Sequence, residues 1–312
     1  MARKSGRYVD GILLLDKPSG MTSNRALRRV SRCLDARKAG HTGSLDPLAT
    51  GLLVLCFGEA TKVSGWLLDA DKQYLTTARL GVTTDSADAD GTVVEARRVP
   101  DLDDPELESV LACFRGEIEQ VPPMFSALKH QGRRLHELAR EGVVVDREPR
   151  RVTIHGLSGR MTAPDRLELR VDCTKGTYIR SLVADLGERL GCGAHVESLR
   201  RTALGPFRDP VMWRLEDLEE CASGGPEALD ACLLPPDQAL TGHPAVTLAS
   251  GQAPAFCQGQ AAAPATALPA EARGAGPLRV YSEFGAFLGI GRADDGGSVA
   301  PRRLLVQRSS GG

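Results

Sequence analysis

A glycine-rich loop followed by an apolar run is the feature that most constrains the fold of this chain. Residues 40–51 contain three glycines, the histidine His41 and the aspartate Asp46, and they lead directly into the apolar segment 52–57. Glycines at this density indicate backbone that turns tightly or approaches another group closely. Pro47 disfavours helix at Asp46, so we expect this carboxylate to lie on a loop. The apolar segment is expected to be a buried strand or helix that anchors this loop from behind.

Taken alone, the loop is compatible with more than one role. It lacks the Gly-Lys-Ser/Thr ending of a P-loop and the glycine spacing of a dinucleotide site. A turn in which Asp46 caps the following helix would explain it equally well. A catalytic role for Asp46 therefore needs support from other parts of the chain.

Length and composition limit the class of protein. A chain of 312 residues with 42% hydrophobic and 25% charged residues is typical of a soluble protein with one large and one small domain. Because no apolar run approaches the roughly 20 residues of a membrane span, and the basic tail 1–9 has no apolar signal core behind it, we expect a cytoplasmic protein. The eight cysteines form no C-x-x-C pair, which predicts reduced thiols and no bound metal.

Charge is distributed unevenly, although the net charge is only -1. Residues 1–62 carry eleven Lys or Arg against five Asp or Glu, residues 85–120 carry three against eleven, and residues 121–151 carry seven against four. Basic segments of this kind are suited to hold a polyanion. The alternative is a set of solvated surfaces, which is what most charged runs are.

The apolar periodicity predicts alternating strands and helices up to about residue 202. We expect strands at 11–15, 72–80, 167–173 and 196–202, and helices at about 24–35, 104–114 and 182–190. The acidic segment 83–119 includes Asp85, Asp88 and Asp90, which loosely resemble a calcium loop. The closing ligand is missing, so we interpret this part as a surface hairpin.

Two later regions carry other signals. A lysine, a tyrosine and an arginine meet at the corner 174–181, where Arg180 is either a structural ion-pair partner or a group that keeps a nearby carboxylate ionised. Residues 250–278, rich in Ala, Pro, Gly and Gln, are interpreted as a flexible insertion. They lie within a small β-rich accessory domain at about 240–308.

Six separated motifs resemble, in their order, the bacterial tRNA pseudouridine-55 synthases, the B family of pseudouridine synthases. They cover most of residues 10–210: Leu15–Ser23, His41–Gly51, Tyr74, Pro122–Lys129, Gly176–Arg180 and Leu199–Arg201. The resemblance implies an α+β fold, with a mixed α/β catalytic domain around an antiparallel sheet at 10–239. It also implies a thumb insertion at about 120–151 that grips the T arm of tRNA. The C-terminal domain, 240–308, is expected to be PUA-like and RNA-binding, with the Ala/Pro-rich stretch near 252–276 as a departure from the family.

The resemblance also implies roles for individual residues. Asp46 is expected to be the catalytic carboxylate, Tyr74 the aromatic over the target base and Arg180 the partner of Asp46. The expected substrate-binding residues are His41, Tyr178, Leu199, Lys17 and Lys62.

The implied reaction isomerises uridine 55 in the T-loop of tRNA to pseudouridine. The N1–C1′ glycosidic bond breaks, and the uracil turns and rejoins the sugar through C5, so no redox cofactor, nucleotide or metal is required. The target base must be flipped out of the folded arm. Whether Asp46 attacks C1′, attacks C6 of the base or removes a sugar proton stays open at this point.

Other functions are compatible with parts of the sequence. A non-catalytic tRNA-binding or tRNA-folding protein would use the same surface, and the two roles can coexist. An unrelated hydrolase using His41 and Asp46 lacks a set of nucleophile, base and orienting group or a set of metal ligands. With no heptad pattern, a monomer is expected.

Overall fold

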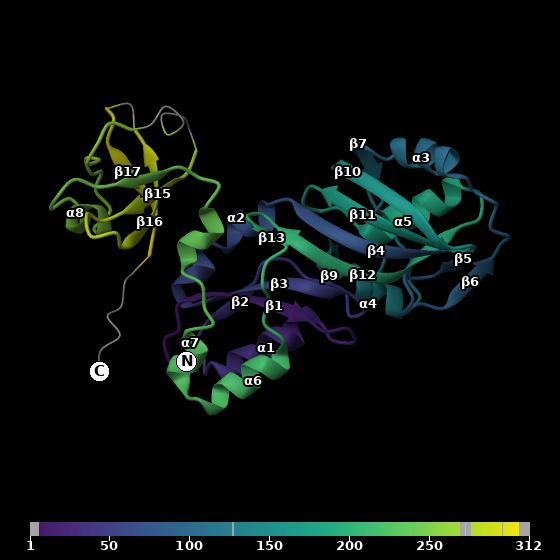
Figure 1. Cartoon of the computed structure of the whole chain (residues 1–312), viewed down its shortest axis with the longest axis horizontal. Coiled ribbons are helices and arrows are strands. Elements are labelled where there is room, and N and C mark those ends of the chain that lie inside the picture. The colour runs from purple at the N-terminus through teal and green to yellow at the C-terminus, as the bar shows by residue number, and fades with distance from the viewer. Residues whose placement is uncertain (1–5, 127, 269–271, 273–275, 295, 306–312) are drawn as a thin grey trace.

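In the computed structural model, a large sheet and a smaller one form two parts of the molecule (Figure 1). The structure describes residues 6–126, 128–268, 272, 276–294 and 296–305. The large sheet contains, in spatial order, β1 (Gly11–Lys17), β3 (Thr50–Phe57), β12 (Ala194–Leu204), β4 (Lys72–Leu80), β11 (Arg166–Cys173), β10 (Arg150–Ala163) and β7 (Gly116–Gln120). In addition, β2 (Ala39–His41) pairs with β3, and β13 (Phe207–Arg208) pairs with β12. The expected α+β fold with a mostly antiparallel sheet is confirmed.

Strands β1 and β3 are covered on both faces, which explains why their sequences read as continuous apolar runs. Leu13 and Leu15 belong to one buried cluster, which includes residues of α1 (Ser23–Cys33), α6 (Leu215–Ser223) and α7 (Pro226–Asp230). Ile12 and Leu14 belong to another, with residues of η1 (Gly58–Lys62), α2 (Ser64–Asp69) and η2 (Pro236–Leu240). On the remaining strands, α3 (Asp104–Ala112) packs against β10 and α5 (Ile179–Arg189) against β12.

The loop that carries Asp46 enters the sheet at a parallel pair of strands. Thr50 and Gly51 of β3 lie opposite Arg200 and Arg201 of β12. Gly51 has a φ of +91°, and a Cβ there would lie 2.3 Å from the carbonyl oxygen of Arg201, so only glycine fits. This close approach places the end of the Leu199–Arg201 motif directly beside the loop.

The helices confirm most expected positions and show one shifted start. The side chain of Thr22 accepts a hydrogen bond from the backbone N–H of Arg25 and so caps α1. The acidic segment forms the expected hairpin, β5 (Val82–Thr84) with β6 (Val93–Ala96). Helix α5 begins at Ile179 rather than Leu182. Its start is held by the side chain of Gln120, a contact across 58 residues that no local pattern reveals.

The predicted thumb is a segment that leaves the main sheet and returns to it at one pair of opposite residues. Gln120 ends β7 and lies opposite Arg150, which begins β10, so residues 121–149 leave and return at the same place. They form β8 (Lys129–His130), β9 (Arg133–Arg134) and α4 (Leu135–Arg140). Met124, Leu135 and Leu138 make a small buried cluster of their own, separate from the clusters of the main sheet. The thumb therefore packs largely on itself.

The C-terminal sheet contains β14 (Ala245–Thr247), β15 (Leu278–Tyr281), β16 (Phe287–Ala293) and β17 (Val299–Leu304). The expectation of a flexible insertion is wrong for much of the Ala/Pro-rich stretch. Helix α8 (Ala253–Cys257) lies within it, and Phe256, Ala262 and Leu268 are buried in the core of this sheet. Residues 269–271 and 273–275 of that stretch lie outside the described residues.

The two parts share a packed interface. Ile290 and Leu305 of the C-terminal part belong to the same buried cluster as Ile12 of β1. The guanidinium of Arg302 lies 5.9 Å from the ring centre of Trp66 in α2, within the range of a cation–π contact. The C-terminal sheet is thus fixed to the face of the main sheet that α2 covers.

Candidate active site

Asp46 lies on a loop between β2 and β3 that hydrogen bonds hold from two sides. The hydroxyl of Ser23 in α1 accepts from the backbone N–H of Leu45, at 2.8 Å, and donates to its carbonyl oxygen, at 3.1 Å. The ammonium of Lys17 donates to the carbonyl oxygen of Pro47 at 3.2 Å. The Asp46 side chain keeps 36% of its surface exposed, so this fixed loop presents a carboxylate that a substrate can reach.

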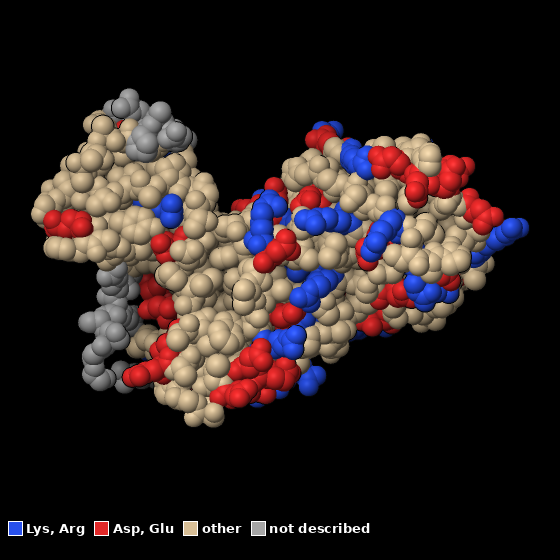
Figure 2. Space-filling model, viewed as in Figure 1, with Lys and Arg blue, Asp and Glu red and all other residues tan. Residues whose placement is uncertain are grey.

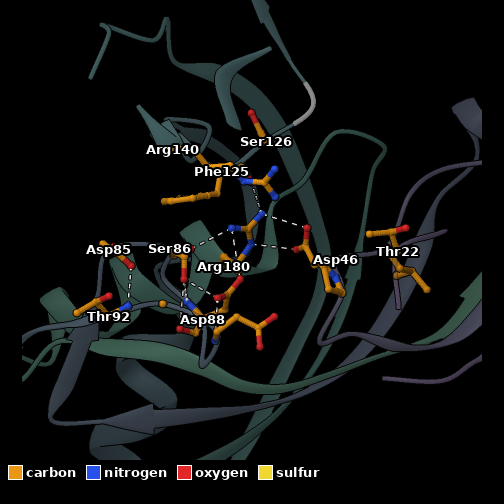
Figure 3. Close-up of a pocket in the computed structure, with 14 residues that line it drawn as sticks. Thr22, Asp46, Asp85, Ser86, Asp88, Thr92, Phe125, Ser126, Arg140 and Arg180 are labelled. Carbon is orange, nitrogen blue, oxygen red and sulfur yellow. Dashed lines mark hydrogen bonds and ion pairs between the residues drawn. The ribbon is translucent and has the colours of Figure 1, made fainter. Parts of the chain in front are cut away.

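Arg180 forms a two-point contact with Asp46 (Figure 3). Its Nε lies 3.0 Å from Oδ2 of Asp46, and its Nη2 lies 3.2 Å from Oδ1. The arginine side chain is only 4% exposed and comes from the first turn of α5. A paired contact of this kind fixes the orientation of the carboxylate as well as its charge. The structure thus brings together two residues that lie 134 positions apart in the sequence.

Asp88 is a second partner of Arg180, and the sequence interpretation missed it. The turn between β5 and β6 was expected at the surface, yet Asp88 is buried, with its Oδ2 3.4 Å from Nη1 of Arg180. The same guanidinium donates to the carbonyl oxygens of Ser86, at 2.9 Å, and Phe125, at 2.7 Å. The cluster of aspartates before Gly91 is the sequence signal that could have indicated a functional carboxylate in this turn. The interpretation as surface holds for Asp85 and Asp90, which are exposed. It is wrong for Asp88, because its partner Arg180 is remote in sequence.

Burial dominates the ionisation of Asp46. Desolvation raises the pKa of this carboxyl group above its ordinary value, the positive charge of Arg180 opposes that shift, and the negative charge of Asp88 adds to it. Arg180 therefore offsets part of the burial effect without cancelling it. A carboxylate that is costly to ionise is also a stronger base and nucleophile than an exposed one.

The Asp46–Arg180 pair lies between two pockets. Both pockets are lined by Leu45, Asp46, Ser126 and Arg180. One, of about 430 Å³, is bounded by the Asp88 turn and by residues of the thumb, including Phe125. The other, of about 340 Å³, is bounded by α2, β4, β12 and the start of α5. The second pocket is the one that collects the predicted aromatic and apolar residues.

This second pocket, called here the aromatic pocket, contains Tyr74, Tyr178 and Leu199 together with Asp46 and Arg180. Tyr74 of β4 is 8% exposed, and burial raises the pKa of its hydroxyl. Tyr178 precedes the first residue of α5, and Leu199 comes from β12. Five of the eight predicted site residues therefore meet in one place, although they come from distant segments of the chain.

Arg201 is a further residue of this pocket that was not predicted as a site residue. It is 1% exposed, and its guanidinium donates to the carbonyl oxygens of Leu52, at 2.7 Å, and Gly43, at 3.1 Å. Burial raises the pKa of the Tyr74 hydroxyl, and the positive charge of Arg201 opposes this rise. Arg201 thus ties the Asp46 loop to β3 and acts on the tyrosine through its charge. Its place in the Leu199–Arg201 motif was the signal that could have found it.

The other three predicted residues do not line the aromatic pocket. His41 lies on β2, and burial lowers the pKa of its imidazole. Lys17 is fully buried and donates to three backbone carbonyls, of which Pro47 belongs to the Asp46 loop; burial lowers its pKa to about 8. Lys62 is remote from the pocket, because its ammonium contacts Glu59 and donates to the carbonyl of Leu304 at 2.8 Å. Lys17 is placed to support the loop, and Lys62 to join the two domains.

Two kinds of feature are absent from the residues that the structure describes. Among them, no group of three or more His, Cys, Asp or Glu side chains is arranged to hold a metal ion. No helix in the described part of the chain is long and apolar enough to cross a membrane.

The chain matches three consecutive family models. Residues 31–179 match the N-terminal domain of the TruB family pseudouridylate synthases. Residues 180–241 match the C-terminal domain of tRNA pseudouridylate synthase B, and residues 244–305 match the C-terminal region of pseudouridine synthase II TruB. Together these models span most of the chain, including the Asp46 loop, Arg180 and the C-terminal sheet.

Curated relatives and a solved structure agree with these matches. The chain is 55% identical over 300 residues to tRNA pseudouridine synthase B of Ectopseudomonas mendocina, covering 96% of each chain. It is 52% identical over 304 residues to the protein of the same name from Chromohalobacter salexigens, covering 97% of this chain and 96% of the relative. A structure described as a Cbf5-Nop10-Gar1 complex matches with a TM-score of 0.74 and 26% identity, over 96% of this chain and 85% of that one. The chain belongs to the TruB family of pseudouridine synthases.

Proposed function

We propose that this protein isomerises uridine 55 in the T-loop of tRNA to pseudouridine, with Asp46 as the catalytic carboxylate. The observation that carries the proposal is the pairing of a two-point contact, between half-exposed Asp46 and buried Arg180, with an adjoining pocket lined by tyrosines and a leucine. Relatives at 55% and 52% identity bear the name tRNA pseudouridine synthase B, which supports tRNA as the substrate.

The chemistry requires an ionised carboxylate beside the sugar and a dry place for the detached base. In this proposal the flipped uracil enters the aromatic pocket and lies against Tyr74, with Tyr178 and Leu199 as its other walls. Asp46 then faces the ribose, where it attacks C1′, attacks C6 or removes a sugar proton. In each of these routes Arg180 holds the carboxylate in one orientation, so the group is in place before the N1–C1′ bond breaks.

Atoms balance without a co-reactant. The N1–C1′ bond breaks, a C5–C1′ bond forms, the hydrogen on C5 leaves as a proton and N1 gains a proton. The protein's contribution is positional and electrostatic, supplied by the two charged side chains and by the pocket walls.

The surroundings of the site fit a folded RNA arm. The thumb borders the pocket of about 430 Å³ that the Asp88 turn also bounds. Phe125 and Arg140 of the thumb line this pocket. Figure 2 shows many Lys and Arg side chains, mixed with acidic ones, over the catalytic domain, and few charged side chains on the C-terminal domain. We therefore assign the grip on RNA phosphates chiefly to the catalytic domain and its thumb. His41 would hold the RNA beside the flipped base, and Lys17 and Lys62 would act through the protein framework.

The same proposal includes the setting in which the enzyme works. We propose a cytoplasmic monomer, because tRNA is modified where it is made and because the sequence carries no heptad pattern that would pair two copies. Binding the T arm with its loop opened would also assist tRNA folding. The boundaries 10–239 for the catalytic domain and 240–308 for a PUA-like RNA-binding domain belong to the proposal as well.

The test is tritium release from a tRNA transcript labelled with [5-³H]uridine, since forming the C5–C1′ bond expels the hydrogen on C5. A second transcript differs only in having cytidine at the target position of the T-loop. Release from the first transcript and not from the second is the expected result. Release from both would refute the target site, and binding without release from either would favour the non-catalytic tRNA-binding protein.

A further inference from the structure

The root of the thumb is joined to the first turn of α5 by side-chain contacts. Gln120, the last residue of β7, uses both ends of its amide on the backbone of Tyr178. Its Oε1 accepts from the N–H at 3.0 Å, and its Nε2 donates to the carbonyl oxygen at 3.3 Å. The hydroxyl of Ser181 donates to the carbonyl oxygen of Val121 at 3.0 Å. The start of the thumb is therefore hydrogen-bonded to the helix turn that supplies Tyr178 and Arg180 to the aromatic pocket.

Gln120 is suited to this contact by its chemistry and its burial. A glutamine side chain carries both an acceptor and a donor, so it can satisfy the N–H and the C=O of one residue. Gln120 is 2% exposed, so water does not replace these bonds when the side chain is removed. The Tyr178 carbonyl oxygen also accepts the helical hydrogen bond from the N–H of Leu182 at 3.1 Å, so Gln120 adds a partner for the N–H and a second donor to the carbonyl at the start of α5.

The contact has consequences for the reaction. Tyr178 and Arg180 lie within three consecutive residues, and Arg180 also donates to the Phe125 carbonyl of the thumb at 2.7 Å. A shift of the thumb root would thus reach a wall of the pocket and the partner of Asp46. Errors of about 1 Å in a reacting group can reduce rates up to roughly a hundredfold.

We propose that Gln120 is a positioning residue, which fixes the backbone of Tyr178 and thereby couples the root of the thumb to the aromatic pocket. This inference rests on the proposed function, because it assigns Tyr178 to the pocket that receives the uracil. Gln120 touches no substrate in this account. It acts through Tyr178, so its loss lowers the rate of the chemical step more than the affinity for tRNA.

Gln73 offers a matched control in the same sheet. It is 5% exposed, its amide donates to Asp172 at 2.8 Å, and it accepts from the hydroxyl of Thr202 at 3.0 Å. Gln73→Ala thus removes a buried glutamine with two hydrogen bonds without touching Tyr178. Both alanine variants should lower the melting temperature, but only Gln120→Ala should also reduce the single-turnover rate at saturating tRNA, by about tenfold or more.

Gln120→Glu gives a second readout that a merely structural role would not produce. A carboxylate cannot donate to the Tyr178 carbonyl, whereas the protonated acid can donate and accept as glutamine does. The rate of this variant, expressed relative to wild type at each pH, should rise as the pH is lowered, and that of Gln120→Ala should stay flat. A flat ratio for both variants, or an equal loss of rate in Gln73→Ala, would overturn the proposal.

Hydrogen exchange separates this proposal from the proposed function, because it requires no activity. Peptides containing Tyr178, and peptides from the thumb root, should exchange faster in Gln120→Ala and at the wild-type rate in Gln73→Ala. Unchanged exchange in Gln120→Ala would refute the coupling. Absence of tritium release from the wild-type protein would instead refute the isomerase assignment and leave the exchange result to decide on Gln120.

Discussion

At the scale of single residues, the site depends on three charges that share one buried space. Arg180 is 3% exposed and lies between Asp46 and Asp88, so one positive charge faces two carboxylates. Removing one partner of a buried charged group leaves the others without compensation. The three side chains therefore form one electrostatic unit, and substitutions within it should not have additive effects.

The first prediction concerns Asp88→Asn. In the proposed reaction Asp46 acts as an ionised carboxylate, and burial raises its pKa above the ordinary value of an aspartate, so the rate of the wild-type enzyme should increase with pH through an acidic limb. Asp88 contributes to the rise in pKa, so Asp88→Asn should move this limb to lower pH. The plateau rate should also fall about tenfold, because Nη1 of Arg180 loses a charged partner.

Single-turnover rates measured as a function of pH would test both parts of this prediction. Asp90→Asn is a suitable control, because Asp90 lies in the same turn but is exposed to solvent. Its acidic limb should coincide with that of the wild type. A limb that moves to higher pH in Asp88→Asn would contradict the assigned sign of the Asp88 contribution.

The residue scale also shows what the sequence could and could not reveal. The loop position of Asp46 follows from local signals, namely the glycines and Pro47. Its contact with Arg180 came only from the family resemblance, and the contact of Arg180 with Asp88 escaped notice because it spans 92 positions. The substrate-binding role expected for Lys62 also came from the family resemblance, whereas its ammonium donates to the carbonyl oxygen of Leu304. Long-range side-chain pairs are fixed by the sheet order, which local patterns do not encode.

At the scale of elements, the thumb is attached to the sheet yet packed on itself. Gln120 and Arg150 lie opposite each other on adjacent antiparallel strands, so a two-residue turn is long enough to replace residues 121–149. The Met124, Leu135 and Leu138 cluster is separate from the main core. The catalytic sheet should therefore remain folded without the thumb.

The second prediction is that replacing residues 121–149 with Asn-Gly changes the melting temperature by only a few degrees. The affinity for tRNA should fall about tenfold, a loss near 1.4 kcal/mol, because the thumb no longer holds the arm. Circular dichroism and filter binding measure the two quantities. Global unfolding of the shortened chain, or unchanged affinity in a folded one, would contradict this account of the thumb.

Element boundaries were predictable where the signal was local. Strand β4 follows from alternation, and its expected range 72–80 is confirmed. The cap of α1 by Thr22 agrees with the general preference for threonine at this position. The start of α5 was placed three residues late because its support comes from Gln120. The stretch around α8 is interpreted as flexible from its composition, but Phe256 and Ala262 within it are buried in the core of the C-terminal sheet.

At the scale of the whole molecule, the two domains share buried surface and should unfold together. Ile290 is fully buried in a cluster with Ile12 and Leu52 of the main sheet. The third prediction is one calorimetric transition for the wild-type protein. Ile290→Asp places a charge in this interface, so the C-terminal domain should melt separately and at lower temperature. Two transitions in the wild type would contradict the shared core.

Tritium release and tRNA binding by Asp46→Asn, measured beside the wild type, test the central claim most directly. Asparagine keeps the size of the side chain and removes its charge, so the fold and the aromatic pocket should persist. We predict no detectable release from the [5-³H]uridine-labelled transcript, with tRNA affinity within about tenfold of wild type, or 1.4 kcal/mol. Isomerisation at an undiminished rate by Asp46→Asn would show that another group performs the chemistry and would contradict the account.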